Sequence, residues 1–161
     1  MSKLIFAILL AVLLPFAAAA QSKEPYGQVY VFVAPTSTTE GGFGLHIGGG
    51  AEGLVYKGLG VGGEIGYLGS ADGLRDGIGV ISTNISYHFT KATKSRKFAP
   101  FVTSGYSMLF RSSALNAVNI GGGANWWFKD RIGLRLELRD QIPLQLSSFH
   151  FFGVRIGLAF R

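Results

Sequence analysis

The sequence predicts an all-β protein, an eight-stranded antiparallel up-and-down transmembrane β-barrel preceded by a signal peptide. Three observations lead to this fold class. Apolar residues alternate with small or polar residues along eight stretches of about ten residues, a pattern that indicates strands with two unlike faces. The polar face consists mainly of Gly, Ser and Asn, which suits the inside of a narrow barrel. The stretches between the strands show no helical period.

The first twenty residues, 1–20, have the features of a secretory signal peptide. Lys3 gives a positively charged start, residues 4–17 form an apolar run, and residues 18–20 supply the small side chains of a cleavage site. The alternative is a membrane anchor, but the run falls short of the roughly 20 residues that a spanning helix needs. We therefore expect cleavage after residue 20 and one β-barrel domain over residues 21–161.

The charge and the cysteine content exclude other classes of protein. The net charge is +6, and without Lys3 it is +5, from 14 basic and 9 acidic residues. An exported chain does not meet nucleic acid, and the basic residues are not gathered on one helix, so no nucleic-acid partner is expected. Because the chain has no cysteine, its stability must come from packing and from a closed hydrogen-bond network.

The predicted strands follow one another with only turns and loops between them. The first strand is expected over residues 26–34 and should end at Pro35. The next two, residues 43–55 and 59–68, form a hairpin across a tight turn at residues 56–58. The remaining strands are expected over residues 78–89, 98–110, 116–128, 132–141 and 150–161.

The connections fall into two groups that should lie at opposite ends of the barrel. One group comprises the turns at residues 56–58 and 129–131 and the basic segment at 90–97. The other group comprises the loops at residues 36–42, 69–77, 111–115 and 142–149.

The apolar faces carry large aliphatic residues at mid-strand and aromatic residues near the strand ends. One set of ends carries Tyr87, Phe89, Trp126, Phe128 and Phe160, and the other carries Tyr67, Phe110 and Phe152. Two aromatic girdles around an apolar band are typical of a membrane barrel, and closure of the barrel leaves no unpaired strand edge in lipid. Periodicity alone leaves one alternative open, a secreted lipocalin-like binder with its apolar face inside. The small residues of the polar face favour the membrane barrel.

With these features the chain resembles the small eight-stranded outer-membrane β-barrel proteins, of the outer membrane protein A transmembrane domain and outer membrane protein X type (the outer membrane protein β-barrel domain family). The resemblance covers residues 26–161 and includes the tail HFFGVRIGLAFR. The tail is similar to the insertion signal that the barrel assembly machinery reads, except that Arg161 follows the last aromatic residue. The signal residues would be Phe152, Val154, Ile156, Leu158 and Phe160.

The resemblance implies a location, a topology and partners. The protein would be exported through a cleaved signal peptide and folded into the outer membrane, with both termini and the turns in the periplasm and the four loops outside the cell. Its partners would be outer-membrane lipid and lipopolysaccharide, and during biogenesis the barrel assembly machinery and periplasmic chaperones. The expected role is structural or surface interaction; a narrow channel or a small-ligand-binding barrel is the alternative.

Six charged residues on the polar faces form the main candidate site. They are Glu52, Glu64, Arg135, Glu137, Arg139 and Arg155. Charges inside a narrow barrel must pair, because an unpaired buried charge is very costly. One interpretation is a charge network that fills the lumen, in which Arg155 meets Glu52, Glu64 or Glu137; the other is a gate in a narrow conductance path. Eight strands leave no aqueous channel, which favours the first interpretation.

Other motifs carry no predicted chemistry. The segment 58–63 matches G-x-G-x-x-G, but a strand pattern runs through it and no helix follows, as a dinucleotide site would need. His46, His88 and His150 lie on three separate strands, and no Ser-His-acid arrangement has outward access, since Ser86 and His88 both point inward. We therefore expect no catalytic, cofactor-binding or metal site, and no enzyme. The glycine triplets at 48–50 and 121–123 are expected to make room for large neighbours such as Trp127 or the arginines.

Overall fold

The computed structural model describes residues 27–70, 73–89, 97–111, 113–145 and 148–161. The predicted signal peptide, its cleavage site and most of the basic segment 90–97 lie outside the described residues. Within the described part of the chain, no helix is long and apolar enough to span a membrane.

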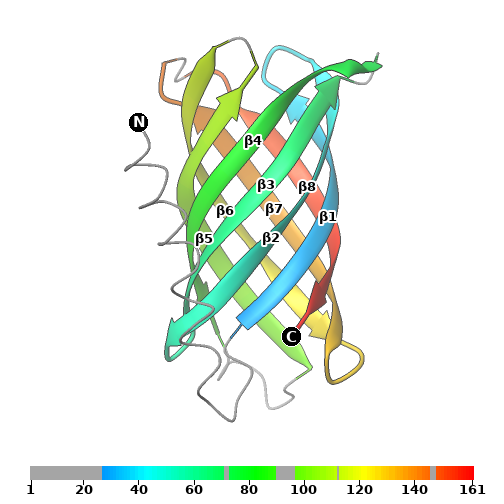
Figure 1. Ribbon diagram of the computed structural model, residues 1–161, viewed down its shortest axis with the longest axis vertical. Coiled ribbons are helices and arrows are strands. Elements are labelled where there is room, and N and C mark those ends of the chain that lie inside the picture. Colours follow the sequence, from blue (N-terminus) through cyan, green and yellow to red (C-terminus); the bar gives the residue numbers. More distant parts are fainter. Residues whose placement is uncertain (1–26, 71–72, 90–96, 112, 146–147) are drawn as a thin grey trace, which may run out of the picture.

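The strands form a closed antiparallel barrel in which each strand pairs with its neighbours in sequence, and β8 pairs back onto β1 (Figure 1). The predicted fold class, an eight-stranded up-and-down barrel, is therefore confirmed. The strands are β1 Gly27–Thr38, β2 Phe43–Tyr56, β3 Leu59–Ser70, β4 Gly73–His88, β5 Phe98–Phe110, β6 Ala114–Trp127, β7 Ile132–Pro143 and β8 Phe151–Phe160. We call the end of the barrel that holds Gly27 and Arg161 the terminal end, and the opposite end the loop end.

The first strand does not end at Pro35, as predicted, but continues to Thr38. Pro35 faces outward and pairs with Leu45 of β2. On the other edge, the pairing of β1 with β8 is interrupted at Pro35, between the pairs Val33–Ile156 and Thr36–Gly153. Proline lacks the backbone N–H that a ladder needs. The strand therefore tolerates Pro35 because β2 continues the pairing on its other edge.

All strands except β8 are also longer than the predicted ten residues, mainly at the loop end. β4 has 16 residues and starts at Gly73, so most of the predicted loop 69–77 is strand. β7 likewise continues to Pro143, beyond the predicted start of the loop 142–149. These extensions lack strict alternation of apolar and polar residues, which is the signal from which strand ends are predicted.

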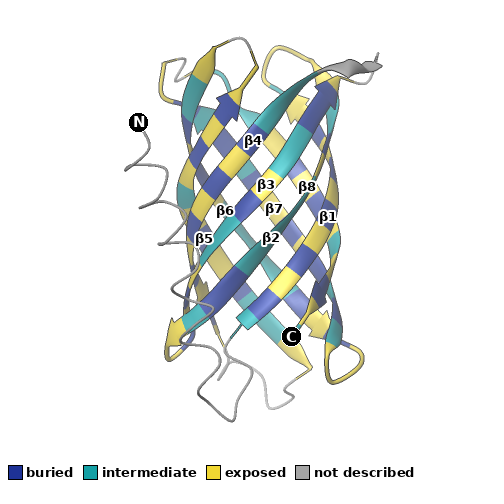
Figure 2. Ribbon diagram, in the orientation of Figure 1, coloured by how far each residue is buried: buried dark blue, intermediate teal, exposed yellow. Residues whose placement is uncertain are grey.

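The two faces of the barrel have the predicted inverted polarity. Buried and exposed residues alternate along the strands (Figure 2). Most of the exposed strand positions are apolar: Ile65 of β3, for example, is 65% exposed and Ile120 of β6 is 59% exposed. The lumen instead holds buried Glu, Arg, Asn and Ser side chains. This arrangement contradicts the lipocalin-like alternative, which requires the apolar face inside.

Aromatic rings on the outer wall near the loop end cover neighbouring glycines. A Cβ atom on Gly79 would collide with the ring of Phe110, which is its partner in the β4–β5 register. Similarly, the Tyr67 hydroxyl accepts a hydrogen bond of 2.8 Å from the backbone N–H of Gly77. Aromatic cover of strand glycines helps to fix register, so these aromatic residues have a structural role within the barrel wall.

Inward-facing glycines of β2 make room for the large side chains of the neighbouring strand β1. A Cβ atom on Gly50 would lie 2.8 Å from Cζ of Tyr30 and 2.7 Å from Cγ of Glu64, and one on Gly48 would lie 2.9 Å from Cζ of Phe32. The expected neighbours of this triplet, Trp127 and the arginines, are therefore wrong: rings from β1 take the space.

We expect Gly50→Val to destabilise the barrel strongly, because its side chain would displace Tyr30 and Glu64 in a close-packed interior. Overpacking of this kind typically costs about 1–3 kcal/mol. Gly63→Ala is the control, since its Cβ would contact only the Ser82 carbonyl oxygen, at 3.6 Å. Urea unfolding of both variants in detergent micelles measures the difference, and equal midpoints would show that Gly50 is not sterically required.

Candidate functional site in the barrel lumen

The six predicted charges come together in the lumen as one network. All six are at least 93% buried. Glu52 comes from β2 and Glu64 from β3, while the three arginines and Glu137 come from β7 and β8. Because alternate residues of a strand face the same side, Arg135, Glu137 and Arg139 all point inward from β7. The network thus joins the second and third strands to the last two across the lumen.

Glu64 is the most highly shared carboxylate of the network. It accepts a hydrogen bond from the Tyr30 hydroxyl at 2.7 Å and one from Arg139 Nη1 at 2.7 Å. Arg155 Nη1 donates to both of its oxygens, at 3.0 and 3.1 Å. A carboxylate held by two guanidiniums and a phenol is well satisfied in charge-assisted hydrogen bonds. Of the partners predicted for Arg155, Glu64 is the one with the shortest contacts.

Glu137 links the arginines of β7 to one another. Its Oε2 accepts hydrogen bonds from Nε and Nη2 of Arg135, at 3.2 and 3.1 Å, and its Oε1 accepts one from Nε of Arg139. Arg155 Nη1 lies 3.9 Å from the same Oε1 atom. Glu137 therefore lies close to all three guanidiniums, and it supplies the negative charge between Arg135 and Arg139.

Glu52 extends the network toward the terminal end. Its Oε1 contacts the Ser86 hydroxyl and lies 2.8 Å from Nε2 of His88. Its Oε2 accepts a hydrogen bond of 2.6 Å from the Gln28 amide and lies 3.8 Å from Nη1 of Arg135. Polar side chains from β1 and β4 thus complete the surroundings of a carboxylate that has only one distant guanidinium.

Aromatic rings cover the guanidinium planes of two arginines. The Arg135 guanidinium carbon lies 4.4 Å from the centroid of the Tyr30 ring and 3.9 Å from that of Phe101. The guanidinium of Arg155 lies 4.2 Å from the Phe32 ring. Such cation–π contacts are strongest where water is excluded.

Sequence reasoning missed the contribution of β1 to this site. Tyr30, Phe32 and Gln28 were not assigned to a face, although Val29, Val31 and Val33 alternate with them. The row of valines marks the lipid face of β1. That alternation was the signal that could have placed Gln28, Tyr30 and Phe32 inside.

Apolar and aromatic groups fill the lumen on both sides of the charge network. At the terminal end, Trp127 is buried, and the guanidinium carbon of Arg161 lies 4.2 Å from the centroid of its ring. Nε of Arg161 also donates a hydrogen bond of 2.9 Å to the Asp130 carbonyl oxygen. At the loop end, Leu68, Val80, Leu109 and Ala117 form a buried cluster. The network therefore lies in a packed interior.

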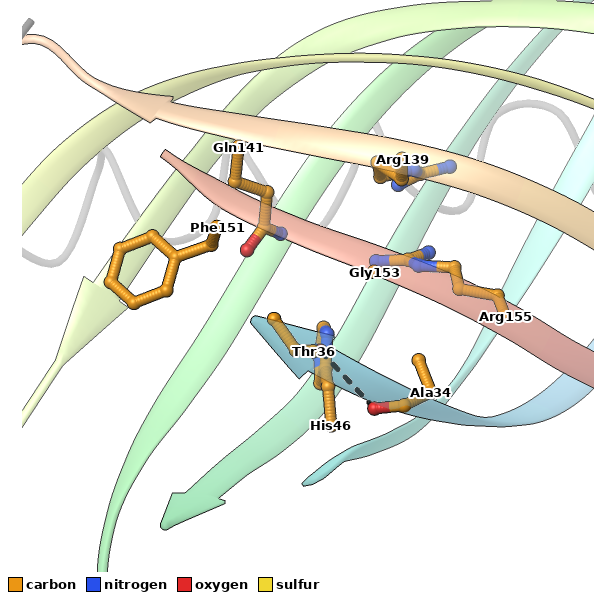
Figure 3. A pocket seen from close by; sticks show the side chains of 8 residues that line it. All are labelled: Ala34, Thr36, His46, Arg139, Gln141, Phe151, Gly153 and Arg155. Carbon is orange, nitrogen blue, oxygen red and sulfur yellow. Dashed lines mark hydrogen bonds between the residues drawn. The ribbon is translucent and has the colours of Figure 1, made fainter. Parts of the chain in front are cut away.

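A small cavity remains beside this loop-end cluster, and we call it the loop-end cavity (Figure 3). Its volume is about 10 Å³. One water molecule needs a cavity of about 10–15 Å³. The guanidiniums of Arg139 and Arg155 form one side of it. The full lining is Ala34, Thr36, His46, Arg139, Gln141, Phe151, Gly153 and Arg155.

The three histidines do not converge. His88 contacts Glu52 near the terminal end, whereas His46 lines the loop-end cavity and packs edge-on against Phe32 at 5.1 Å. His150 lies just before β8, with its Nδ1 2.7 Å from a carboxylate oxygen of Asp140. Each histidine therefore has a separate local environment.

The residues of the predicted insertion signal all lie on the outer wall of β8. Their side chains are 37–46% exposed, and they alternate with the inward-facing Gly153, Arg155, Gly157 and Ala159. The predicted signal residues are Phe152, Val154, Ile156, Leu158 and Phe160.

Comparisons with known proteins place the fold. No family model matches the sequence, and no curated protein matches it. Among solved structures, the chain is similar to the N-terminal β-barrel domain of Pseudomonas aeruginosa OprF, with a TM-score of 0.63 and 16% identity over 83% of this chain and 96% of that one. It is also similar to neisserial surface protein A (NspA), with a TM-score of 0.61 and 12% identity over 83% and 94% of the two chains. The chain has the fold of the small eight-stranded outer-membrane β-barrels.

A further similarity agrees with this small-barrel fold. The outer membrane protein OprG from Pseudomonas aeruginosa matches with a TM-score of 0.54 and 10% identity over 83% of this chain and 94% of that one. At these identities the likeness concerns the fold alone. A role beyond the fold must therefore be argued from this chain's own residues.

Proposed function

We propose that this chain is an integral outer-membrane β-barrel with a structural or surface-interaction role. Its lumen is closed by aromatic rings that pack against glycines and by paired charges. The observation that carries the proposal is the largely apolar outer wall around a buried, balanced network of three carboxylates and three guanidiniums. An apolar wall of this extent is stable only against lipid. A charge network with every member paired stabilises one register of the closed barrel.

The proposed topology places the terminal end in the periplasm and the loop end outside the cell. The connections at the loop end would then meet lipopolysaccharide and external partners. The apolar residues of β8 would serve as the insertion signal for the barrel assembly machinery, after escort by periplasmic chaperones. Arg161 is compatible with this role, because its side chain turns back over Trp127.

Membrane fractionation combined with a gel-shift assay tests the location. The expected result is a protein found in the outer-membrane fraction that migrates faster when unheated than when boiled, because the closed barrel resists detergent. Recovery of the protein in the soluble periplasmic fraction would overturn the proposal.

Planar-bilayer recording tests the closed lumen. We expect purified protein to show no resolved conductance steps, because Trp127 at one end and the Leu68 cluster at the other pack against the charge network. Regular single-channel steps from the folded protein would instead support the alternative, a narrow channel that opens by exchange of charge pairs.

A further inference from the structure

We propose that the loop-end cavity binds one small inorganic anion, of about the size of a halide ion. The cavity is lined by two guanidiniums, of Arg139 and Arg155, together with polar groups of Thr36, His46 and Gln141, and no carboxylate lines it. Glu64 and Glu137, which pair with these arginines, are not part of the lining. A ligand in the cavity therefore faces the guanidinium side of these ion pairs, and not their carboxylates, together with polar side chains.

Two buried polar atoms at this cavity have no protein partner. Nε2 of His46 and the Nε2 amide nitrogen of Gln141 are buried without a hydrogen bond, and both residues are 96% buried. A buried donor left unpaired is costly, and such groups in folded proteins normally bind another group. The Gln141 amide comes from β7, two residues beyond Arg139, so both point into the lumen from the same face. A hydrogen-bond acceptor in the cavity would pair with the Gln141 amide and would also face the guanidiniums of Arg139 and Arg155.

The size of the cavity selects the ligand. A volume of about 10 Å³ accommodates one water-sized particle. Halide ions are the anions nearest to this size. The space exists because Gly153 and Ala34 present little or no side chain to it. The competing occupant is a single water, which would pair with the unpartnered nitrogen atoms of Gln141 and His46 without using the charge of the two guanidiniums.

One glycine allows the cavity to be filled without changing any charge. A Cβ atom on Gly153 would lie 3.2 Å from Oγ1 of Thr36 and 3.8 Å from Cβ of Ala34, so Gly153→Ala places a methyl group in the cavity with small adjustments. Gly122→Ala is the matched control. Its Cβ would lie on the outer wall, 3.5 Å from the Phe101 carbonyl oxygen. A second variant, Gln141→Leu, removes the amide at similar volume.

The direct test is anomalous diffraction from crystals grown in sodium bromide. The expected result is a bromide peak within hydrogen-bond distance of Arg139, Arg155 or Gln141 in the wild type and in Gly122→Ala, and its loss in Gly153→Ala. If Gly153→Ala does not fold, Gln141→Leu should show a weakened peak. An ordinary water at this place with no anomalous signal would overturn the proposal.

Thermal unfolding in micelles gives an independent readout. Replacing gluconate by chloride at constant ionic strength should raise the Tm of the wild type and of Gly122→Ala by about 2–4 °C, because a ligand that binds only the folded state stabilises it. Gly153→Ala should not respond. An equal response of all three proteins would place the anion effect elsewhere and overturn the proposal.

Discussion

Replacement of Glu64 by glutamine is expected to destabilise the folded barrel by about 3–5 kcal/mol, the usual cost of breaking a buried ion pair from one side. The change removes the negative charge that Arg139 and Arg155 share and leaves both guanidiniums in an interior with a low dielectric constant. The Tyr30 hydroxyl also loses a charged acceptor. Urea unfolding in detergent micelles, followed by the gel shift of the folded form, measures the loss.

Two further variants show whether the loss comes from uncompensated charge. Glu40→Gln makes the same chemical change at an exposed loop position and should alter stability little. The double variant Glu64→Gln with Arg155→Met removes one charge of each sign and should recover part of the loss. If the double variant were as unstable as the sum of its single variants, the pairing between Glu64 and Arg155 would not be the source of the effect.

The second large effect is expected for Leu136→Arg, which should prevent stable folding into a bilayer. Leu136 is 46% exposed on the outer wall of β7, between the inward-facing Arg135 and Glu137. An arginine on the lipid face near the bilayer midplane costs about 2–4 kcal/mol. The folded fraction after dilution from urea into phospholipid vesicles, read from the gel shift, gives the size of the effect.

Leu144→Arg is the matched control, because it places the same charge near the end of the barrel and not near the bilayer midplane. Leu144 is 56% exposed and follows directly after the last residue of β7, at the loop end. Near the interface the same substitution costs only about 0–1 kcal/mol, so this variant should fold almost as well as the wild type. Equal losses in both variants would mean that the outer wall of β7 does not face lipid.

The faces of the barrel could be predicted from sequence because inside and outside alternate with a period of two along every strand. Once the polar face is assigned to the lumen, Glu52, Arg135 and Arg155 follow without further information. The pairing within the network could not be predicted in the same way. Which carboxylate meets Arg155 depends on the stagger between strands on opposite sides of the barrel. No local pattern encodes that stagger, and so Glu52, Glu64 and Glu137 were equivalent candidates.

Strand ends were predicted less well, for two physical reasons. Pro35 has the character of a strand terminator, but the ladder to β2 continues past it. At the start of β4, the strand extends beyond the apolar band into residues that have turn-like composition. The loop-end cavity was also beyond prediction, since it depends on small residues of β1 and β8 that become neighbours only when the barrel closes.

The origin of the lumen charges in the chain has a consequence for the order of assembly. Glu64 and Arg155 are 91 positions apart in sequence, and Glu64 and Arg139 are 75 apart. A chain that has added only its first six strands carries Glu52 and Glu64 without the three arginines that pair with them. Those carboxylates must stay hydrated until β7 and β8 dock, since dehydrating an unpaired charge is too costly. Expulsion of water from the lumen therefore marks the completion of the barrel, and it is the last two strands that bring it about.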